Sequence, residues 1–278
     1  MKRKGSLVVW FALTLVCGAF AKAGDAAEKQ LKQALDNQVL SLRVPTGSSK
    51  LHFDSNGRAV GTVVPVPWTT GGLLQVKEIS LKHDALRIEA QRVLVALRSG
   101  KSASSSPSLA TILTERSVFV SLDLDPGPVD SKKIGAALGQ IFEPVDIQKR
   151  IASYWMPAIT TTPDVWSAEM GQIVGTLEGG RAVYRAKPGV VELPKTLNAP
   201  DPEYSEDARK KHLQGTTELM IVVNEKGLPE ILEVVKGLGE GLDVKALEAV
   251  SEWRFRPGNR DGEPVAVMLN VQMTFSLY

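Results

Sequence analysis

The stretch Glu248–Val267, EAVSEWRFRPGNRDGEPVAV, decides the fold of the C-terminal quarter of the chain. Apolar residues recur at helical spacing up to Trp253, and Phe255 follows two residues later, at strand spacing. Pro257 then ends a short strand, and the Asp-Gly pair at 261–262 turns the chain. We therefore predict a corner at which a helix gives way to strands and both aromatic rings reach one core.

Two aromatic residues among arginines are also typical of nucleic-acid surfaces. The chain of 278 residues carries 33 Lys and Arg against 31 Asp and Glu, a formal net charge of +2. A polyanion-binding protein needs a basic patch or stripe, which the sequence lacks. Arg254 and Arg256 alternate with the aromatics, so we expect them to point to solvent. The sequence therefore predicts no nucleic-acid partner.

Beyond the turn, apolar and polar residues alternate to the end of the chain, which is typical of a strand with one buried face. The polar positions are Asn270, Gln272, Thr274 and Ser276. The apolar positions, expected to share the buried face, are Val265, Val267, Leu269, Val271, Met273, Phe275 and Leu277.

Upstream of the corner, the sequence predicts a helix, two strands and a second helix. Residues 205–211 place a serine at the helix start and acidic residues in the first turn. Apolar alternation predicts a strand at 216–224, and the Asn-Glu-Lys-Gly turn at 224–227 leads to a return strand at 228–236. We expect Asp243 to cap the second helix.

The N-terminus has the features of an export signal. Lysine and arginine at positions 2–4 precede an apolar run from 7 to 20, and residues 19–21 fit the small-x-small cleavage pattern. We predict a signal peptide at 1–21, with a short uncleaved membrane anchor as the alternative; the apolar run is shorter than the roughly 20 residues of a spanning helix. The only cysteine, Cys17, lies in this segment, so the cleaved chain would form no disulfide.

The region between the signal and the corner predicts a β-rich domain at 25–186. A turn at 55–58 contains Asn-Gly, which accepts the positive φ of a hairpin turn. The stretch 187–203 is rich in proline and is interpreted as a linker to a C-terminal domain at 204–278. Strands are expected around 39–44, 50–54, 72–97, 117–125, 173–177 and 182–186, helices at 26–35, 131–142 and 146–155, and loops at 101–108 and 159–164.

No set of residues in the sequence has the spacing of an active site. The histidines, His52, His83 and His212, do not lie at metal-ligand spacing. No nucleophile motif occurs, and the glycine-rich run at 237–241 lacks the spacing of a phosphate loop. Asp123 and Asp125 alternate on a strand, where a solvated acidic face is the common explanation. We predict a binding protein, with no enzymatic activity, no metal and no cofactor.

Short motifs in the last part of the chain occur in an order and spacing that is specific as a set. From about residue 202 to 278, this set resembles the C-terminal domain of TonB-type energy transducers. The resemblance depends on Tyr204, Ala208, Gly215, Gly227, Asp243, Ala246, Trp253, Phe255, Pro257 and Gly262.

The resemblance implies an α+β fold in which a small antiparallel sheet packs on two helices. It also implies a periplasmic protein that binds the plug-side peptide of an outer-membrane TonB-dependent receptor, and that has ExbB/ExbD-like motor proteins as further partners. The peptide would add as a strand to the sheet edge. The implied edge residues are Val267, Met268, Leu269, Asn270, Val271, Gln272 and Met273.

The chain departs from this family in three places, and these keep a second function open. The usual Tyr-Pro at the domain start is Tyr204-Ser205, a β-rich region replaces the long spacer, and the leader contains no histidine. The first hypothesis is a TonB-like transport adaptor, either free in the periplasm or anchored in the inner membrane. The alternative is an envelope interaction module that uses the same sheet edge without coupling to the motor. A homodimer stays open in both.

Overall fold

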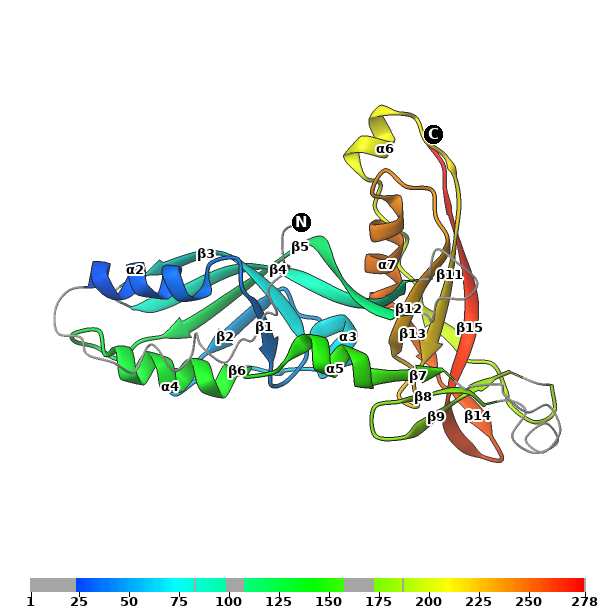
Figure 1. The fold of residues 1–278 in the computed structure, drawn as a ribbon, viewed down its shortest axis with the longest axis horizontal. Helices are drawn as coiled ribbons and strands as arrows, with labels where there is room; N and C mark the ends of the chain where they lie inside the picture. The colour runs from blue at the N-terminus through cyan, green and yellow to red at the C-terminus, as the bar shows by residue number, and fades with distance from the viewer. Residues whose placement is uncertain (1–23, 83, 99–107, 158–172, 187, 278) are drawn as a thin grey trace, which may run out of the picture. The chain divides into compact units, whose positions relative to one another are not determined.

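A computed structural model describes residues 24–82, 84–98, 108–157, 173–186 and 188–277 (Figure 1). The predicted signal peptide, His83, the expected loop at 159–164 and all but the last residue of the expected loop at 101–108 lie outside these ranges. Strands dominate and helices are few, which confirms the α+β class.

Two compact units account for the described residues. Unit 1 comprises those within Met1–Leu94 and Leu113–Arg150, and unit 2 those within Val95–Ile112 and Ile151–Tyr278. The helices are α2 Gly24–Leu35, α3 Trp68–Gly71, α4 Ser131–Ile141, α5 Ile147–Tyr154, α6 Glu206–Lys210 and α7 Leu242–Glu252. The strands are β1 Val39–Leu42, β2 Lys50–Phe53, β3 Leu73–Leu81, β4 Ala85–Arg98, β5 Ser108–Asp123, β6 Phe142–Glu143, β7 Trp155–Pro157, β8 Ile173–Leu177, β9 Arg181–Arg185, β10 Lys195–Asn198, β11 Gly215–Val223, β12 Pro229–Lys236, β13 Arg254–Arg256, β14 Gly258–Arg260 and β15 Glu263–Phe275.

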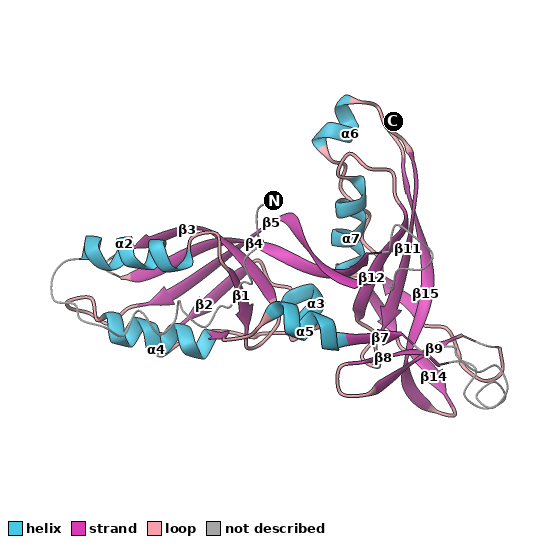
Figure 2. Cartoon of the chain, in the orientation of Figure 1, coloured by secondary structure: helices cyan, strands magenta, loops and turns pink. Residues whose placement is uncertain are grey.

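Unit 1 is a sheet covered by helices, coloured separately in Figure 2. Its strand order is β6-β1-β3-β4-β5-β2. Helices α2 and α4 bury their apolar residues in the same cluster as the strands, with Leu31 and Leu35 from α2 and Ile134 and Leu138 from α4. The predicted alternation at 72–97 forms the antiparallel pair β3 and β4.

The strand β2 has a different partner from the one that its turn suggests. Residues 55–58 do turn, with Gly57 at a φ of 78°, and Phe53 forms a single bridge with Ala59. The ladder of β2, however, runs parallel to β5 and pairs Lys50 with Phe119. A parallel partner about seventy residues away leaves no local trace in the sequence, so the Asn-Gly signal indicated only the turn.

Unit 2 is built on the antiparallel strands β12, β11 and β15, with α7 packed on β11 and β12 (Figure 1). Strand β11 is central, because it pairs with β12 on one side and with β15 on the other. The sheet continues from β15 through β9 and β8 to β7, and β12 also forms a parallel pair with β4 at Glu233 and Leu97. The strand β10, within the proline-rich stretch, pairs with β13.

The corner at Trp253 differs in detail from the prediction. Phe255 is buried, but Trp253 is only half-buried and ends α7, with its indole N–H donating to the Pro200 carbonyl at 3.0 Å. The two ring centroids lie 6.0 Å apart. Arg254 does not point freely to solvent, because its guanidinium donates to the carbonyls of Glu252 and Trp253. The proline-rich stretch at 187–203 therefore supplies part of the contact of Trp253.

The predicted cap at Asp243 is wrong. The residue before α7 is Gly241, in a left-handed conformation and without a side-chain cap. Asp243 lies inside the first turn, and its carboxylate instead accepts the backbone N–H groups of Leu238 at 2.8 Å and Gly239 at 3.0 Å. An acidic residue near a helix start is favourable at both positions, so composition alone did not distinguish them.

Candidate functional site

The strand β15 has one fully paired edge and one partly paired edge. Along the first edge, residues 267–275 pair with β11 from Val223 to Gly215. On the opposite edge, β9 pairs in parallel with Ala266, Val267 and Met268. Among the described residues, no strand pairs with 269–275 on that second edge. Within the described part of the chain, the backbone N–H and C=O groups on this side of 269–275 thus have no strand partner; we call 269–275 the open stretch.

The open stretch has the predicted two-faced side-chain pattern. Val271, Met273 and Phe275 are buried, whereas Asn270 and Gln272 are exposed. The ring of Phe275 also packs edge-on against Tyr204, with centroids 5.6 Å apart. The buried face holds the strand in the domain, so that its open edge is a rigid ladder and not a loose segment.

The structure divides the predicted edge residues, Val267–Met273, into two groups. Val267 and Met268 have β9 on the side opposite β11. The five that follow have an unpaired second edge within the described part of the chain: Leu269, Asn270, Val271, Gln272 and Met273.

A tight hairpin sets the start of β15. Arg260 of β14 pairs with Glu263 of β15, and the two residues between them, Asp261 and Gly262, have φ values of 54° and 91°. Two central residues with positive φ are typical of a type I′ turn, whose twist matches that of the strands it joins. The Asp-Gly pair in the sequence therefore specifies the register in which β15 begins.

The turn between β11 and β12 fixes the corner to the sheet. Gly227 has a φ of 74°, and its carbonyl accepts the backbone N–H of Phe255 at 2.9 Å. A Cβ at this position would lie 1.9 Å from the Phe255 carbonyl oxygen. Only glycine fits there, which is the physical reason for the glycine in this part of the motif set.

The start of the domain is held by a serine and a tyrosine. The Ser205 hydroxyl accepts the N–H of Ala208 at 3.2 Å and donates to the Glu240 carbonyl, so it joins α6 to the loop before α7. The Tyr204 hydroxyl donates to the Leu213 carbonyl. Ala208 and Ala246 are fully buried, which leaves no room for larger side chains at these motif positions.

A buried polar network that the sequence did not predict joins β9 to β12. Glu230 of β12 is almost fully buried and accepts hydrogen bonds from the Tyr154 hydroxyl at 2.8 Å and from the Asn224 amide at 2.9 Å. Arg181 of β9 forms an ion pair with the same carboxylate and a second one, at 3.2 Å, with Glu225. These residues are distant in sequence, so only the tertiary structure brings them together.

The network is electrostatically consistent. Burial raises the pKa of Tyr154, and the negative charge of Glu230 adds to that rise. The hydrogen bond to Glu230 raises the pKa of the Arg181 guanidinium. The tyrosine is therefore neutral and the arginine charged across the neutral pH range, as an anchoring role requires.

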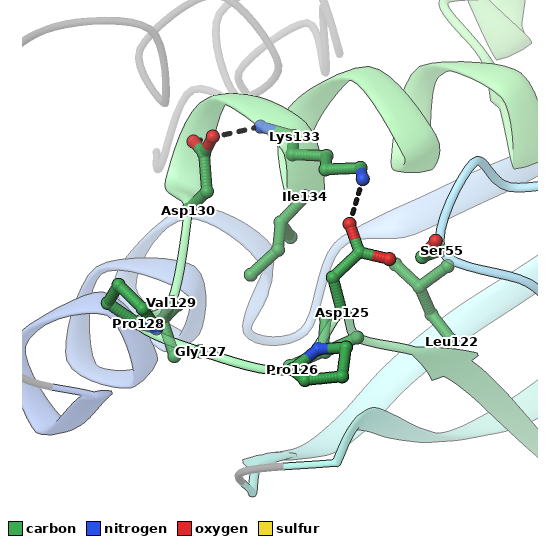
Figure 3. Close-up of a pocket in the computed structure, with 11 residues that line it drawn as sticks. Ser55, Leu122, Asp125, Pro126, Gly127, Pro128, Val129, Asp130, Lys133 and Ile134 are labelled. Atoms are coloured by element: carbon green, nitrogen blue, oxygen red, sulfur yellow. Dashed lines mark hydrogen bonds and ion pairs between the residues drawn. The ribbon is translucent and has the colours of Figure 1, made fainter.

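A cavity of about 270 Å³ in unit 1 offers no comparable function (Figure 3). Asp130 accepts the N–H groups of Lys132 and Lys133 at the start of α4, and the Lys133 ammonium pairs with Asp125. The charged groups that line the cavity thus satisfy one another. Asp123, the other predicted strand acid, contacts His52 at 2.9 Å, with both side chains about half exposed.

Two further observations concern the described residues alone. They contain no group of three or more His, Cys, Asp or Glu side chains arranged to hold a metal ion. None of the helices described is long and apolar enough to cross a membrane.

Residues 200–277 match the family model described as the Gram-negative bacterial TonB protein C-terminal. Similar curated proteins include Protein TonB of Vibrio cholerae serotype O1 (33% identical over 94 residues, covering 33% of this chain and 38% of that protein). Protein tonB2 of Pseudomonas aeruginosa is 34% identical over 82 residues, covering 29% of this chain and 30% of that protein. The chain thus spans well under half the length of either relative.

A solution NMR structure of the Pseudomonas aeruginosa TonB CTD is 19% identical, with a TM-score of 0.28, and covers 34% of this chain and 92% of that one. The motif set from Tyr204 to Gly262 lies wholly within the matched residues. Residues 200–277 of this chain are therefore a TonB C-terminal domain.

Proposed function

We propose that this protein is a TonB-like adaptor of the periplasm, which binds the plug-side peptide of an outer-membrane TonB-dependent receptor by strand addition. The observation that carries the proposal is the open stretch 269–275 of β15, in a domain of the TonB C-terminal family. Backbone hydrogen bonds along this edge would supply affinity, and the exposed side chains of Asn270 and Gln272 would contact the added strand.

The role in transport follows from this binding mode. The adaptor would support energy-dependent transport across the outer membrane, with ExbB/ExbD-like motor proteins as the source of energy. It would act by binding and pulling, not by catalysis. The domain limits proposed for this function are 25–186 and 204–278, joined by 187–203, with the signal or anchor at 1–21.

Proline substitution at two neighbouring positions tests strand addition. The N–H groups of Asn270 and Val271 point to opposite edges of β15, because N–H direction alternates along a strand. One proline therefore removes a donor from the open edge and the other removes a donor bonded to β11. We expect the proline that removes the open-edge donor to abolish binding of a receptor plug-side peptide by the full chain. The circular dichroism spectrum and melting profile of that variant should stay close to those of the parent.

The matched control is Asn270→Thr, which changes the side chain but keeps the backbone N–H. We expect this variant to bind within a few-fold of the parent, because backbone pairing supplies most of the affinity. Isothermal titration with the same peptide measures all three variants. If both proline variants bind as well as the parent while remaining folded, strand addition along β15 is wrong.

The alternative function is an envelope interaction module that uses the same edge for another protein and is not coupled to the motor. The observation that favours it is the short apolar run at 7–20, which is below the length of a spanning helix. Intact-mass and N-terminal analysis of the protein from envelope fractions separates the two. A retained N-terminal segment supports the transducer, and a free form cleaved near Ala21 supports the module.

A further inference from the structure

The second edge of β15 already holds a strand of the same chain. In β9, Val183, Tyr184 and Arg185 pair in parallel with Ala266, Val267 and Met268. The pairing covers three residues, whereas the ladder between β15 and β11 covers nine. Each net hydrogen bond shifts an equilibrium by about a factor of five, so the β9 ladder is much the weaker of the two.

Side-chain contacts anchor β9 at both ends of this short ladder. At its start, Arg181 pairs with the buried Glu230 and with the half-exposed Glu225. Near its end, the Arg260 guanidinium lies 5.2 Å from the centre of the Tyr184 ring. Both anchors act through side chains of residues outside β11, so separation of β9 from β15 breaks these contacts but leaves the β11–β15 ladder intact.

We infer that β9 is an intramolecular occupant of the partner-binding edge, which a partner strand must displace to pair with residues 266–268. The inference rests on the proposed function for its partner, an extended peptide from a receptor. With β9 in place, the peptide can pair only with residues 269–275. With β9 displaced, the peptide can also pair with 266–268, and its affinity rises by the amount by which this pairing exceeds that of β9.

A disulfide between β9 and β15 tests this competition. Arg185 and Met268 are register partners, and paired residues of adjacent strands lie about 4.8 Å apart, within the range that a disulfide spans. The full chain would carry Arg185→Cys and Met268→Cys in a Cys17→Ser background, which has no other cysteine. Each single-cysteine variant serves as the control for the substitution itself.

Two lengths of one receptor plug-side peptide are the probes. A peptide of about ten residues can pair with 266–275, and one of about six residues fits within 269–275. The long peptide replaces the hydrogen bonds of β9 at 266–268, so its gain is only the surplus of its pairing over that of β9. We expect oxidation to weaken binding of the long peptide by about fivefold, the equivalent of one net hydrogen bond, and to leave binding of the short peptide unchanged. Reduction of the disulfide should restore the affinity for the long peptide. Equal affinity of the long peptide for the oxidised and reduced forms would overturn the inference.

Hydrogen exchange tests the strand itself without any peptide. If β9 separates from β15, the amides among Val183–Arg185 that bond to β15 exchange faster than those of the central strand β11, and oxidation slows them. Exchange of β9 that is as slow as that of β11 in the reduced protein would also overturn the inference. Failure of both peptides to bind, together with fast exchange of β9, would refute the proposed function and still support a displaceable β9.

Discussion

The substitution Gly227→Ala tests whether the corner at Phe255 holds the C-terminal domain together. An alanine Cβ would lie 1.9 Å from the Phe255 carbonyl oxygen, and the residue would keep a φ of 74°. The left-handed conformation costs about 1 kcal/mol in a residue other than glycine. The clash is with backbone, so β13 must move, which loses the Phe255 N–H bond to Gly227 (about 1 kcal/mol) and part of the burial of the Phe255 ring (about 1–2 kcal/mol).

The sum is a destabilisation of about 3–4 kcal/mol from these contributions. The matched control is Gly262→Ala, where φ is 91° but no atom lies within 4 Å of the added Cβ, so only the backbone cost of about 1 kcal/mol applies. At about 2–4 °C per kcal/mol, we expect the transition of unit 2 to fall by about 6–16 °C for Gly227→Ala and by about 2–4 °C for the control.

Differential scanning calorimetry of the full chain measures both variants, and hydrogen exchange in β11 assigns the transition to unit 2. Separate assignment is necessary because a chain with two compact units need not unfold in one step. Equal shifts for the two variants would refute the reasoning, since the clash with Phe255 is the only difference that it invokes. A fall of less than 2 °C for Gly227→Ala would do the same.

Two further predictions concern side chains that the structure places in unexpected roles. The pKa of buried Tyr154 is raised in the folded protein, so the contribution of this residue to stability is fully present below the unfolded pKa of about 10 and is lost as the pH rises above it. The substitution Tyr154→Phe should therefore flatten the fall in melting temperature above pH 10, and it should cost about 1 kcal/mol of stability near neutral pH. An unchanged alkaline profile would show that Tyr154 ionises equally in the folded and unfolded states. The substitution Asp243→Ala should lower the free energy of unfolding in urea by about 1–2 kcal/mol, because the N–H groups of Leu238 and Gly239 lose their acceptor. Asp243→Asn should recover part of that free energy. An alanine variant as stable as the parent would contradict the role of Asp243 in holding the loop.

Local elements of the C-terminal domain were predictable because each is specified by neighbouring residues. The alternation in β15 places Val271, Met273 and Phe275 on the buried face, as the sequence predicts. The Asp-Gly pair at 261–262 forms the predicted turn, and Ser205 caps its helix. The misplaced cap at Asp243 arose where two helix-start positions favour the same residue type, so that only the backbone conformation of Gly241 distinguishes them.

Pairings between distant segments were not predictable. A period-2 pattern specifies which face of a strand is buried, but it does not say which strand lies at either edge. The sequence therefore predicted strands at 173–177 and 182–186 but offered no indication that β9 would lie beside β15. The parallel pairing of β2 with β5 escaped prediction for the same reason.

The sequence by itself determined the identity of the C-terminal domain, its order of elements and the apolar face of its last strand. The identity follows from the resemblance of the motif set to the TonB family. The order of elements and the apolar face follow from turn residues, the Ser205 cap and periodicity, all of which act within a few positions. Only the tertiary structure decided how much of the β15 edge is open, because β9 reaches that edge through backbone hydrogen bonds that any sequence can make. The tertiary structure also decided that Arg181 pairs with Glu230. An ion pair of this kind becomes strong and specific only in a buried site of low dielectric, and that site exists only once the chain has folded.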